Sequence, residues 1–278
     1  MEAGAFPSDQ YAAATQAKLH GLTPEATIIT VPPREGERLL RTADIVAAIA
    51  AAGDELALVL FSGVHYGTGQ LFDLGAIAQA GSAAGAVVGL DLAHAVGNTP
   101  LKLHDWGVDF ACWCGYKYVN GGPGALGGAF VHEKYHADES LVKLGGWWAQ
   151  KINSRFAFPV VDRFDPVPGA AGWQASNPPP LLLAPLVAAL DIWAEAGAER
   201  IAAKAELLTV HMQSLLENSE GLGKEVVQVV TPPKPWRGAQ LSIRLLTAGG
   251  LGDDRIDGGV SSEATYPGTV ACGFCVGV

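Results

Sequence analysis

The sequence has little positive charge. Its 278 residues include 18 lysines and arginines against 28 aspartates and glutamates, so the formal net charge is −10 at pH 7. Nucleic acids and anionic membranes attract basic surfaces, and this balance therefore argues against either as a partner. Hydrophobic residues make up 49% of the chain, which is long enough for one large or two small globular domains with buried cores.

Long apolar runs and cysteines are also scarce. The longest apolar run, Leu181–Leu190, contains Pro185 and stops at Asp191, so it is too short to span a bilayer. The N-terminal residues lack the basic and then apolar pattern of a secretory signal. Four cysteines are present, and Cys112 and Cys114 lie too close along one strand for an easy mutual disulfide. These features predict a protein of the reducing cytoplasm.

Short apolar runs alternate with helical patterns in the first half of the chain. The expected strands are 26–31, 56–61, 86–90, 108–113 and 125–131, and the expected helices are 9–20, 43–52 and 71–84, the first capped by Ser8. Such alternation indicates βαβ units and an α/β fold with a mainly parallel sheet flanked by helices. Further on, 180–218 is expected to be helical with a break near Gly197, and 226–230 and 239–245 to be strands of a smaller α+β domain.

Two residues that could carry chemistry follow predicted strands. Asp91 comes directly after the strand 86–90, and Lys117 follows the strand 108–113. The carboxyl ends of parallel strands meet at one edge of a sheet, so both side chains are expected to face one crevice. A lysine opposite an aspartate suits pyridoxal phosphate (PLP), because the lysine forms a Schiff base and the aspartate holds the pyridinium nitrogen. The alternative is that Asp91 caps a turn and Lys117 is a surface lysine.

Two short motifs have simpler explanations. The run Gly121–Gly124 is either a plain turn or room for a cofactor to approach the backbone, and beside Lys117 we favour the second. Cys272 and Cys275 form one CxxC pair, which alone cannot complete a tetrahedral metal site. We therefore expect no metal.

Several blocks of the sequence resemble kynureninases, a family of PLP-dependent, aminotransferase-like hydrolases. The resemblance runs from about Ala3 to about Leu246. The blocks that carry it are Phe6–Asp9, Phe61–His65, Asp91–Asn98, His104–Cys114, Tyr116–Tyr118 and Ser176–Pro179. The resemblance implies the fold of PLP-dependent aminotransferases (fold type I). It divides the chain into a partial PLP-binding large domain (1–180), a linking helix with a partial small C-terminal domain (181–248), and a divergent, poorly ordered tail (249–278).

The resemblance also assigns roles at the cofactor ring. It implies that Lys117 carries the cofactor and moves a substrate proton, and that Asp91 keeps the ring nitrogen cationic. Phe6 matches a residue that stacks on the ring, and Asp9 and His94 match residues beside its pyridine edge. Taken alone, His94 is as consistent with a structural histidine as with a ligand.

Other matching residues would hold the rest of the cofactor. Ser8, Ser62 and Tyr116 match cofactor contacts, and Tyr116 is also a candidate general acid or base through its adjacency to the lysine. Trp147 and Asn177 match residues that kynureninases bring to the cofactor phosphate across a dimer interface. The resemblance therefore implies a homodimer with shared sites.

The implied reaction is hydrolysis of the Cβ–Cγ bond of kynurenine or 3-hydroxykynurenine. The products are anthranilate or 3-hydroxyanthranilate, and alanine, in tryptophan degradation and NAD synthesis. The alternative is a catalytically inactive fragment that acts at most as a subunit-interaction module. A third interpretation, a desulfurase-like PLP enzyme, fits the lysine but not the Asp91–Gly97 and Cys112–Cys114 blocks.

Two departures from the kynureninase pattern stand out. The chain starts almost at its Phe6–Asp9 block, whereas the family carries a substantial portion before it that helps to hold the cofactor phosphate. After Leu246 the expected arginine segment for the substrate carboxylate is missing, and Arg255 is a poor substitute. We therefore expect an N-terminally truncated kynureninase with a tail from a frame or splice change.

Overall fold

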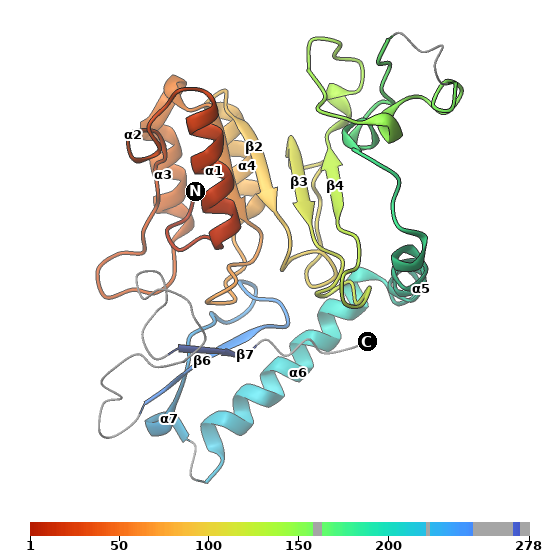
Figure 1. The fold of residues 1–278 in the computed structure, drawn as a ribbon. Helices are drawn as coiled ribbons and strands as arrows, with labels where there is room; N and C mark the ends of the chain where they lie inside the picture. Colours follow the sequence, from red (N-terminus) through yellow and green to blue (C-terminus); the bar gives the residue numbers. More distant parts are fainter. Residues whose placement is uncertain (158–162, 221–222, 247–268, 273–278) are drawn as a thin grey trace.

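The computed structural model describes residues 1–157, 163–220, 223–246 and 269–272. Two β-sheets organise the described part (Figure 1). The first contains β1 (Leu58–Ser62), β2 (Val87–Asp91), β3 (Phe110–Trp113) and β4 (Gly128–Val131), in that spatial order. The first three strands are parallel and β4 is antiparallel to β3, which agrees with a mainly parallel sheet.

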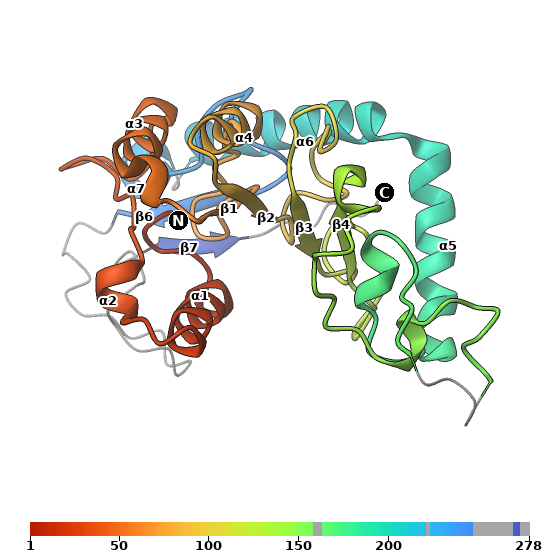
Figure 2. The same cartoon turned by 90° about the horizontal axis from the view of Figure 1, so that it is seen from above.

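Helices lie on both sides of this sheet. Figure 2 shows α3 (Thr42–Ala52) and α4 (Leu74–Ala83) on one side, and α1 (Pro7–Leu19) and the short α2 (Pro24–Thr27) on the other. The side chains of Val88 and Leu90 in β2 are both 0% exposed and pack in the core between the sheet and helices α3 and α4. Gly89 faces the opposite way, where the ring of Phe110 would lie 2.2 Å from an added Cβ, so only glycine fits. The strand that ends on Asp91 is therefore packed closely on both of its faces.

The ends of the helices follow local chemistry, with two corrections. Gly53, at φ 56°, ends α3 as expected. Ser8 is not the cap of α1, because Pro7 takes the first helical position and Phe6 precedes it. The predicted strand 26–31 is also wrong. Pro24 starts the short helix α2, and Val31 makes only an isolated bridge to Glu2.

The segment after β4 has little regular structure. It contains three single-turn helices, η2 (Glu133–Tyr135), η3 (Trp147–Ala149) and η4 (Ala170–Trp173). Asp109 ties its start to the sheet. Its carboxylate accepts hydrogen bonds from the backbone N–H of Val88 at 2.6 Å and the hydroxyl of Tyr135 at 2.7 Å, and pairs with Lys134.

The second half begins with two helices. α5 (Pro180–Ala196) and α6 (Ala198–Asn218) meet at Gly197, which confirms the predicted break. α7 (Gly223–Val226) then leads into an antiparallel sheet of β5 (Val227–Val229), β6 (Leu241–Leu245) and β7 (Thr269–Cys272). The last strand lies within the predicted divergent tail. The rest of that tail, with Arg255 and Cys275, lies outside the described residues.

Among the described residues no single helix is both long and apolar enough to cross a bilayer. Only α5 and α6 taken together reach that length and composition, and they bend by 84° where they join.

Candidate active site

A cavity of about 350 Å³ opens at the carboxyl ends of β1, β2 and β3. This is the edge at which parallel α/β sheets bind ligands. Eight of the ten predicted site residues line it, from four separate stretches of the chain: Phe6, Ser8, Asp9, Ser62, Asp91, His94, Tyr116 and Lys117. The expected crevice between Asp91 and Lys117 therefore exists.

Asp91 is the last residue of β2 and is half-buried. It pairs in register with Ser62 of β1 and Cys112 of β3, so its position follows from the sheet itself. Its Oδ1 accepts a hydrogen bond from the backbone N–H of Ala93 at 2.8 Å. Asp91 therefore caps the following turn, as the simpler interpretation expected, and also faces the cavity.

Lys117 follows β3 and extends over the aromatic wall of the cavity. Its Nζ lies 5.7 Å from the centre of the Phe6 ring. Phe6 in turn meets Tyr66 edge to face, with ring centres 5.2 Å apart. A primary amine thus lies over the face of one aromatic ring, with carboxyl groups on the same cavity wall. Sequence reasoning missed Tyr66.

Asp9 and Asp91 line this cavity together. Burial, and then the charge of Asp91, raise the pKa of Asp9 to about 7, while Lys117 opposes the shift. A substantial fraction of Asp9 therefore keeps its proton near neutral pH, beside the lysine amine.

Glu2 is a buried carboxyl group that sequence reasoning missed. It is 2% exposed and accepts hydrogen bonds from the Ser62 hydroxyl at 2.5 Å and the Ser62 backbone N–H at 3.2 Å. Burial raises the pKa of Glu2, and the Ser62 hydroxyl opposes that rise. The only hydroxyl proton of Ser62 is committed to Glu2, so toward a ligand Ser62 can act only as an acceptor.

His94 lies on the cavity wall and is half-buried. Its Nδ1 is 3.2 Å from the side-chain oxygen of Gln240 in the second half of the chain. Burial and then the nearby charge of Lys117 lower the pKa of His94 to about 4. The ring is therefore neutral at physiological pH. Gln240 was not expected from the sequence.

Tyr116 is on the open side of the cavity, 54% exposed. A hydrogen bond with Cys114, and the charge of that thiol group, raise the pKa of the Tyr116 hydroxyl. Tyr116 therefore keeps its proton at neutral pH and suits the role of a general acid better than that of a base.

Trp147 and Asn177 are not part of this cavity wall. Both are exposed, and the indole N–H of Trp147 donates to the Ser176 hydroxyl at 3.2 Å. Trp147 also packs edge to face on Trp148 and Phe156. The two predicted phosphate contacts thus form one exposed surface outside their own chain's cavity.

The run Gly121–Gly124 is a turn, and the expectation that it makes room for a cofactor is not supported. Gly122 and Gly124 have φ of 84° and 73°, which favours glycine, and an added Cβ at either would meet nothing within 4 Å. Neither lines the cavity. Ala125 and Gly127, just beyond them, do.

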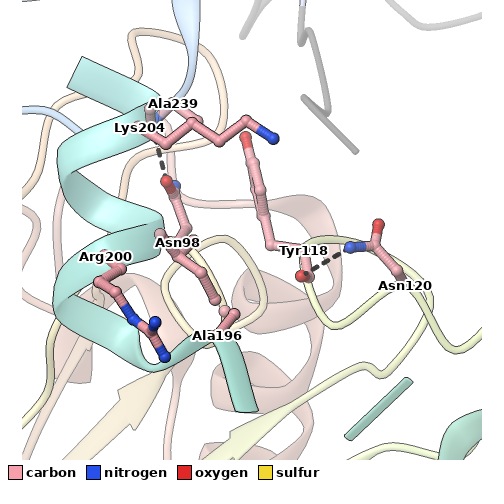
Figure 3. Close-up of a pocket in the computed structure, with 10 residues that line it drawn as sticks. Asn98, Tyr118, Asn120, Ala196, Arg200, Lys204 and Ala239 are labelled. Atoms are coloured by element: carbon pink, nitrogen blue, oxygen red, sulfur yellow. Dashed lines mark hydrogen bonds between the residues drawn. The ribbon is translucent and has the colours of Figure 1, made fainter. Parts of the chain in front are cut away.

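A second hollow of about 210 Å³ lies between α6 and the loops after β2 and Lys117. Figure 3 shows Lys204 extending across it toward the hydroxyl end of Tyr118, and Arg200 lower on the same helix. Its walls are largely apolar, and it contains none of the predicted site residues. Its Asn98 is already bonded to the backbone N–H of Ala239 at 2.7 Å. The chemistry therefore points to the first cavity.

The described residues contain no group of three or more His, Cys, Asp or Glu side chains that could hold a metal ion. Cys112 and Cys114 are free thiols. The cavity instead combines an amine, two carboxyl groups, a neutral imidazole and a phenol. Such a set suits covalent capture of a carbonyl compound by the amine and proton transfers beside it.

Comparisons with known proteins agree with this architecture. Residues 12–232 match the family model described as aminotransferase class-V. The chain is 51% identical over 251 residues to the kynureninase of Xanthomonas campestris pv. campestris strain B100, covering 90% of this chain and 57% of that protein. It is 46% identical over 271 residues to the kynureninase of Flavobacterium psychrophilum, covering 97% and 63%.

The alignment with the Flavobacterium protein covers 97% of this chain and so extends past Leu246. The resemblance therefore continues further along the chain than expected. The chain spans about three-fifths of the length of these curated relatives. Among solved structures, a C-DES variant with glycine covalently linked to its PLP cofactor superposes with a TM-score of 0.67 at 17% identity, covering 88% of this chain and 60% of that one. At this identity the match supports the fold alone.

Proposed function

The chain belongs to the aminotransferase class-V family, and from this premise we propose that it provides the active site of a kynureninase-type hydrolase. The substrate is kynurenine or 3-hydroxykynurenine, and the products are anthranilate or 3-hydroxyanthranilate, and alanine. The observation that carries the proposal is the single cavity shared by Asp91 and Lys117. The curated relatives at 46–51% identity support this reaction over a desulfurase and over an inert fragment.

The residues present fit pyridoxal phosphate. The cavity volume of about 350 Å³ lies in the range of small-molecule sites. Lys117 offers the amine for the cofactor's aldehyde, and the Phe6 ring offers a face for its ring. Asp91 is the carboxylate that would hold the ring nitrogen, with Asp9 on the same cavity wall. When bound, PLP supplies an electron sink beside the substrate's Cα.

The phosphate end of the cofactor is less fully provided for. Ser8 lies in the first turn of α1, where backbone N–H groups favour an anion. Ser62 can contribute only as an acceptor while its hydroxyl donates to Glu2. We therefore assign further phosphate contacts to Trp147 and Asn177 of a second copy.

The chain's own residues divide the proton transfers between them. With PLP bound, Lys117 would hold the cofactor through its amine and would move a proton at the substrate's Cα. Asp91 would hold the charge of the ring nitrogen. Tyr116, whose raised pKa keeps the hydroxyl protonated, donates a proton during the addition of water to the substrate carbonyl.

A homodimer completes the proposal. Trp147 and Asn177 lie exposed and outside their own cavity, which supports a role in the site of a partner. α5 supports it as well, because none of its 17 residues is buried although most are apolar. Free thiols at Cys112 and Cys114 are consistent with the reducing cytoplasm as its location.

Absorbance of the purified protein mixed with PLP tests cofactor binding. We expect a visible band that Lys117→Ala abolishes and that Lys102→Ala, at an exposed lysine, retains. Addition of kynurenine should then release fluorescent anthranilate. A band without anthranilate would contradict the reaction but leave the cofactor assignment, and no band in the unaltered protein would contradict both.

A further inference from the structure

Gln240 links the second sheet to the candidate active site. It precedes β6, is 1% exposed, and its side chain lies between two groups of the first half of the chain. Its Oε1 is 3.2 Å from the Nδ1 of His94, and its Nε2 is 2.6 Å from the backbone carbonyl oxygen of Tyr66. Nε2 also donates to the Ser242 hydroxyl at 3.1 Å.

These distances fix the orientation of the Gln240 amide. A carbonyl oxygen can only accept, so the group 2.6 Å from the Tyr66 oxygen must be the amide nitrogen. The flipped amide would bring two oxygens to that distance with no proton between them. The amide oxygen therefore faces His94.

The orientation of Gln240 in turn fixes the tautomer of His94. An amide oxygen has no proton to give, so the bond at 3.2 Å requires the proton to be on Nδ1 of the imidazole. The titratable groups around the ring are Lys117, Asp91 and His65, and burial with Lys117 keeps the ring neutral at pH 7. A neutral ring with Nδ1 protonated has a bare lone pair on Nε2.

The surrounding contacts prevent Gln240 from turning away. Asn98 donates to the carbonyl oxygen of His94 at 2.8 Å and accepts from the backbone N–H of Ala239 at 2.7 Å. It therefore connects the backbone of His94 to the backbone of the residue that precedes Gln240. Gly238 allows this approach, because an added Cβ would lie 2.2 Å from the Asn98 side chain.

We propose that Gln240 is a positioning residue that holds His94 as the Nδ1–H tautomer, so that Nε2 accepts a hydrogen bond from whatever occupies the cavity. His94 lines the cavity and Gln240 does not, so the edge of the ring that carries Nε2 is the one turned to a ligand. The ligand group at that place must be a donor, an amine or a hydroxyl, and an anionic oxygen is disfavoured there. The identity of that ligand rests on the function proposed above; the tautomer does not.

Nitrogen-15 NMR of histidine-labelled, cofactor-free protein at pH 7 tests the tautomer directly. The His94 signals are assigned by their loss in His94→Gln. We expect a protonated Nδ1 and an unprotonated Nε2 in the unaltered protein. The reverse pattern, or a charged ring, would overturn the proposal without any variant of Gln240.

Two variants separate positioning from general packing. Gln240→Leu removes the acceptor and should yield a substantial Nε2–H population. Thr231→Val disturbs the same buried junction without touching His94 and should leave the tautomer unchanged. An unchanged tautomer in Gln240→Leu, or an equal change in Thr231→Val, would contradict the proposal.

Titration with PLP provides a second measurement. We expect Gln240→Leu to bind PLP roughly tenfold more weakly than the unaltered protein, as for loss of a partner that orients a ligating histidine. Equal affinity would contradict a positioning role. If the unaltered protein fails to bind PLP, the proposed function fails, and the NMR result still decides the tautomer.

Discussion

The cavity region, residues 1–131, and the segment 133–178 differ in how their candidate site residues are held. In the cavity region, Asp91 ends a buried strand, Ser62 is bonded to buried Glu2, and His94 is bonded to buried Gln240. In the segment 133–178, Trp147 is 38% exposed and Asn177 is exposed. Most of the candidate site is therefore assembled within a single chain, whereas Trp147 and Asn177 face outward, which is why we propose that they serve a second copy.

A dimer that carries a different inactivating substitution in each chain gives the largest expected effect in testing this difference. Lys117→Ala removes the amine of one site, and Trp147→Ala removes a contact that serves the partner's site. A purified heterodimer of the two should have one intact site of two and form anthranilate at about half the rate of the unaltered dimer. Each variant alone should be inactive or strongly impaired, since losing a hydrogen bond to a charged phosphate costs about 1.5–3 kcal/mol.

Trp236→Ala serves as the control, because Trp236 is also exposed but lies near the second sheet. A heterodimer of Lys117→Ala and Trp236→Ala should form anthranilate at the same rate as a heterodimer of Lys117→Ala and the unaltered chain. A heterodimer of Lys117→Ala and Trp147→Ala with no activity would contradict a site shared between copies.

Core substitutions should separate the two regions by stability. Ile77 of α4 is 0% exposed and packs in the core between α4 and the sheet. Ile77→Ala should therefore lower the free energy of unfolding by about 2–5 kcal/mol. Val142 is 75% exposed, and Val142→Ala should change it by no more than about 0.5 kcal/mol. Urea denaturation measures both, and equal effects would mean that the segment 133–178 shares the core.

Hydrogen exchange should show the same contrast without any substitution. Amides of β1, β2 and β3 are paired in the sheet and should exchange only through global unfolding. Amides at 141–157 should exchange at least about a hundredfold faster in dilute protein, because this segment has few buried contacts. Their exchange should slow as the concentration rises if a second copy covers them. Independence from concentration would argue against a dimer interface there.

The pH dependence of stability tests the raised pKa of Asp9. Its pKa rises from an ordinary value of 3.8 to about 7 in the folded protein. Between about pH 4 and pH 7 the folded state keeps this proton and the unfolded chain has lost it, so the free energy of unfolding falls as pH rises. Asp9→Asn should flatten this fall in urea titrations. Asp54→Asn, at an exposed position, should not. An unchanged or steeper fall in Asp9→Asn would contradict the raised pKa of Asp9.

Local chemistry in the sequence was sufficient to predict much of the fold. Apolar runs predicted the strand that ends on Asp91, and Gly53 and Gly197 predicted where helices end. Pro7 and Pro24 caused the two local errors, because proline at the first helical position moved one helix start and created another. Both errors follow from the fixed φ of proline, which the apolar pattern does not record.

Long-range contacts could not be predicted in this way. Glu2 meets Ser62 across 60 residues, and Gln240 meets His94 across 146. Nothing in the local pattern around Glu2 or Gln240 marks them as buried, since their burial depends on how separate elements pack. Of the eight cavity residues, spacing alone suggested Asp91 and Lys117, and the other six were predicted because the resemblance named them.

Chemical trapping of the cofactor tests the central claim most directly. The protein is mixed with PLP, reduced with borohydride, digested and analysed by mass spectrometry. We predict one pyridoxyl group per chain, on the peptide that contains Lys117, and its loss in Lys117→Ala. A label spread over surface lysines such as Lys18 and Lys102, with none enriched at Lys117, would contradict the account.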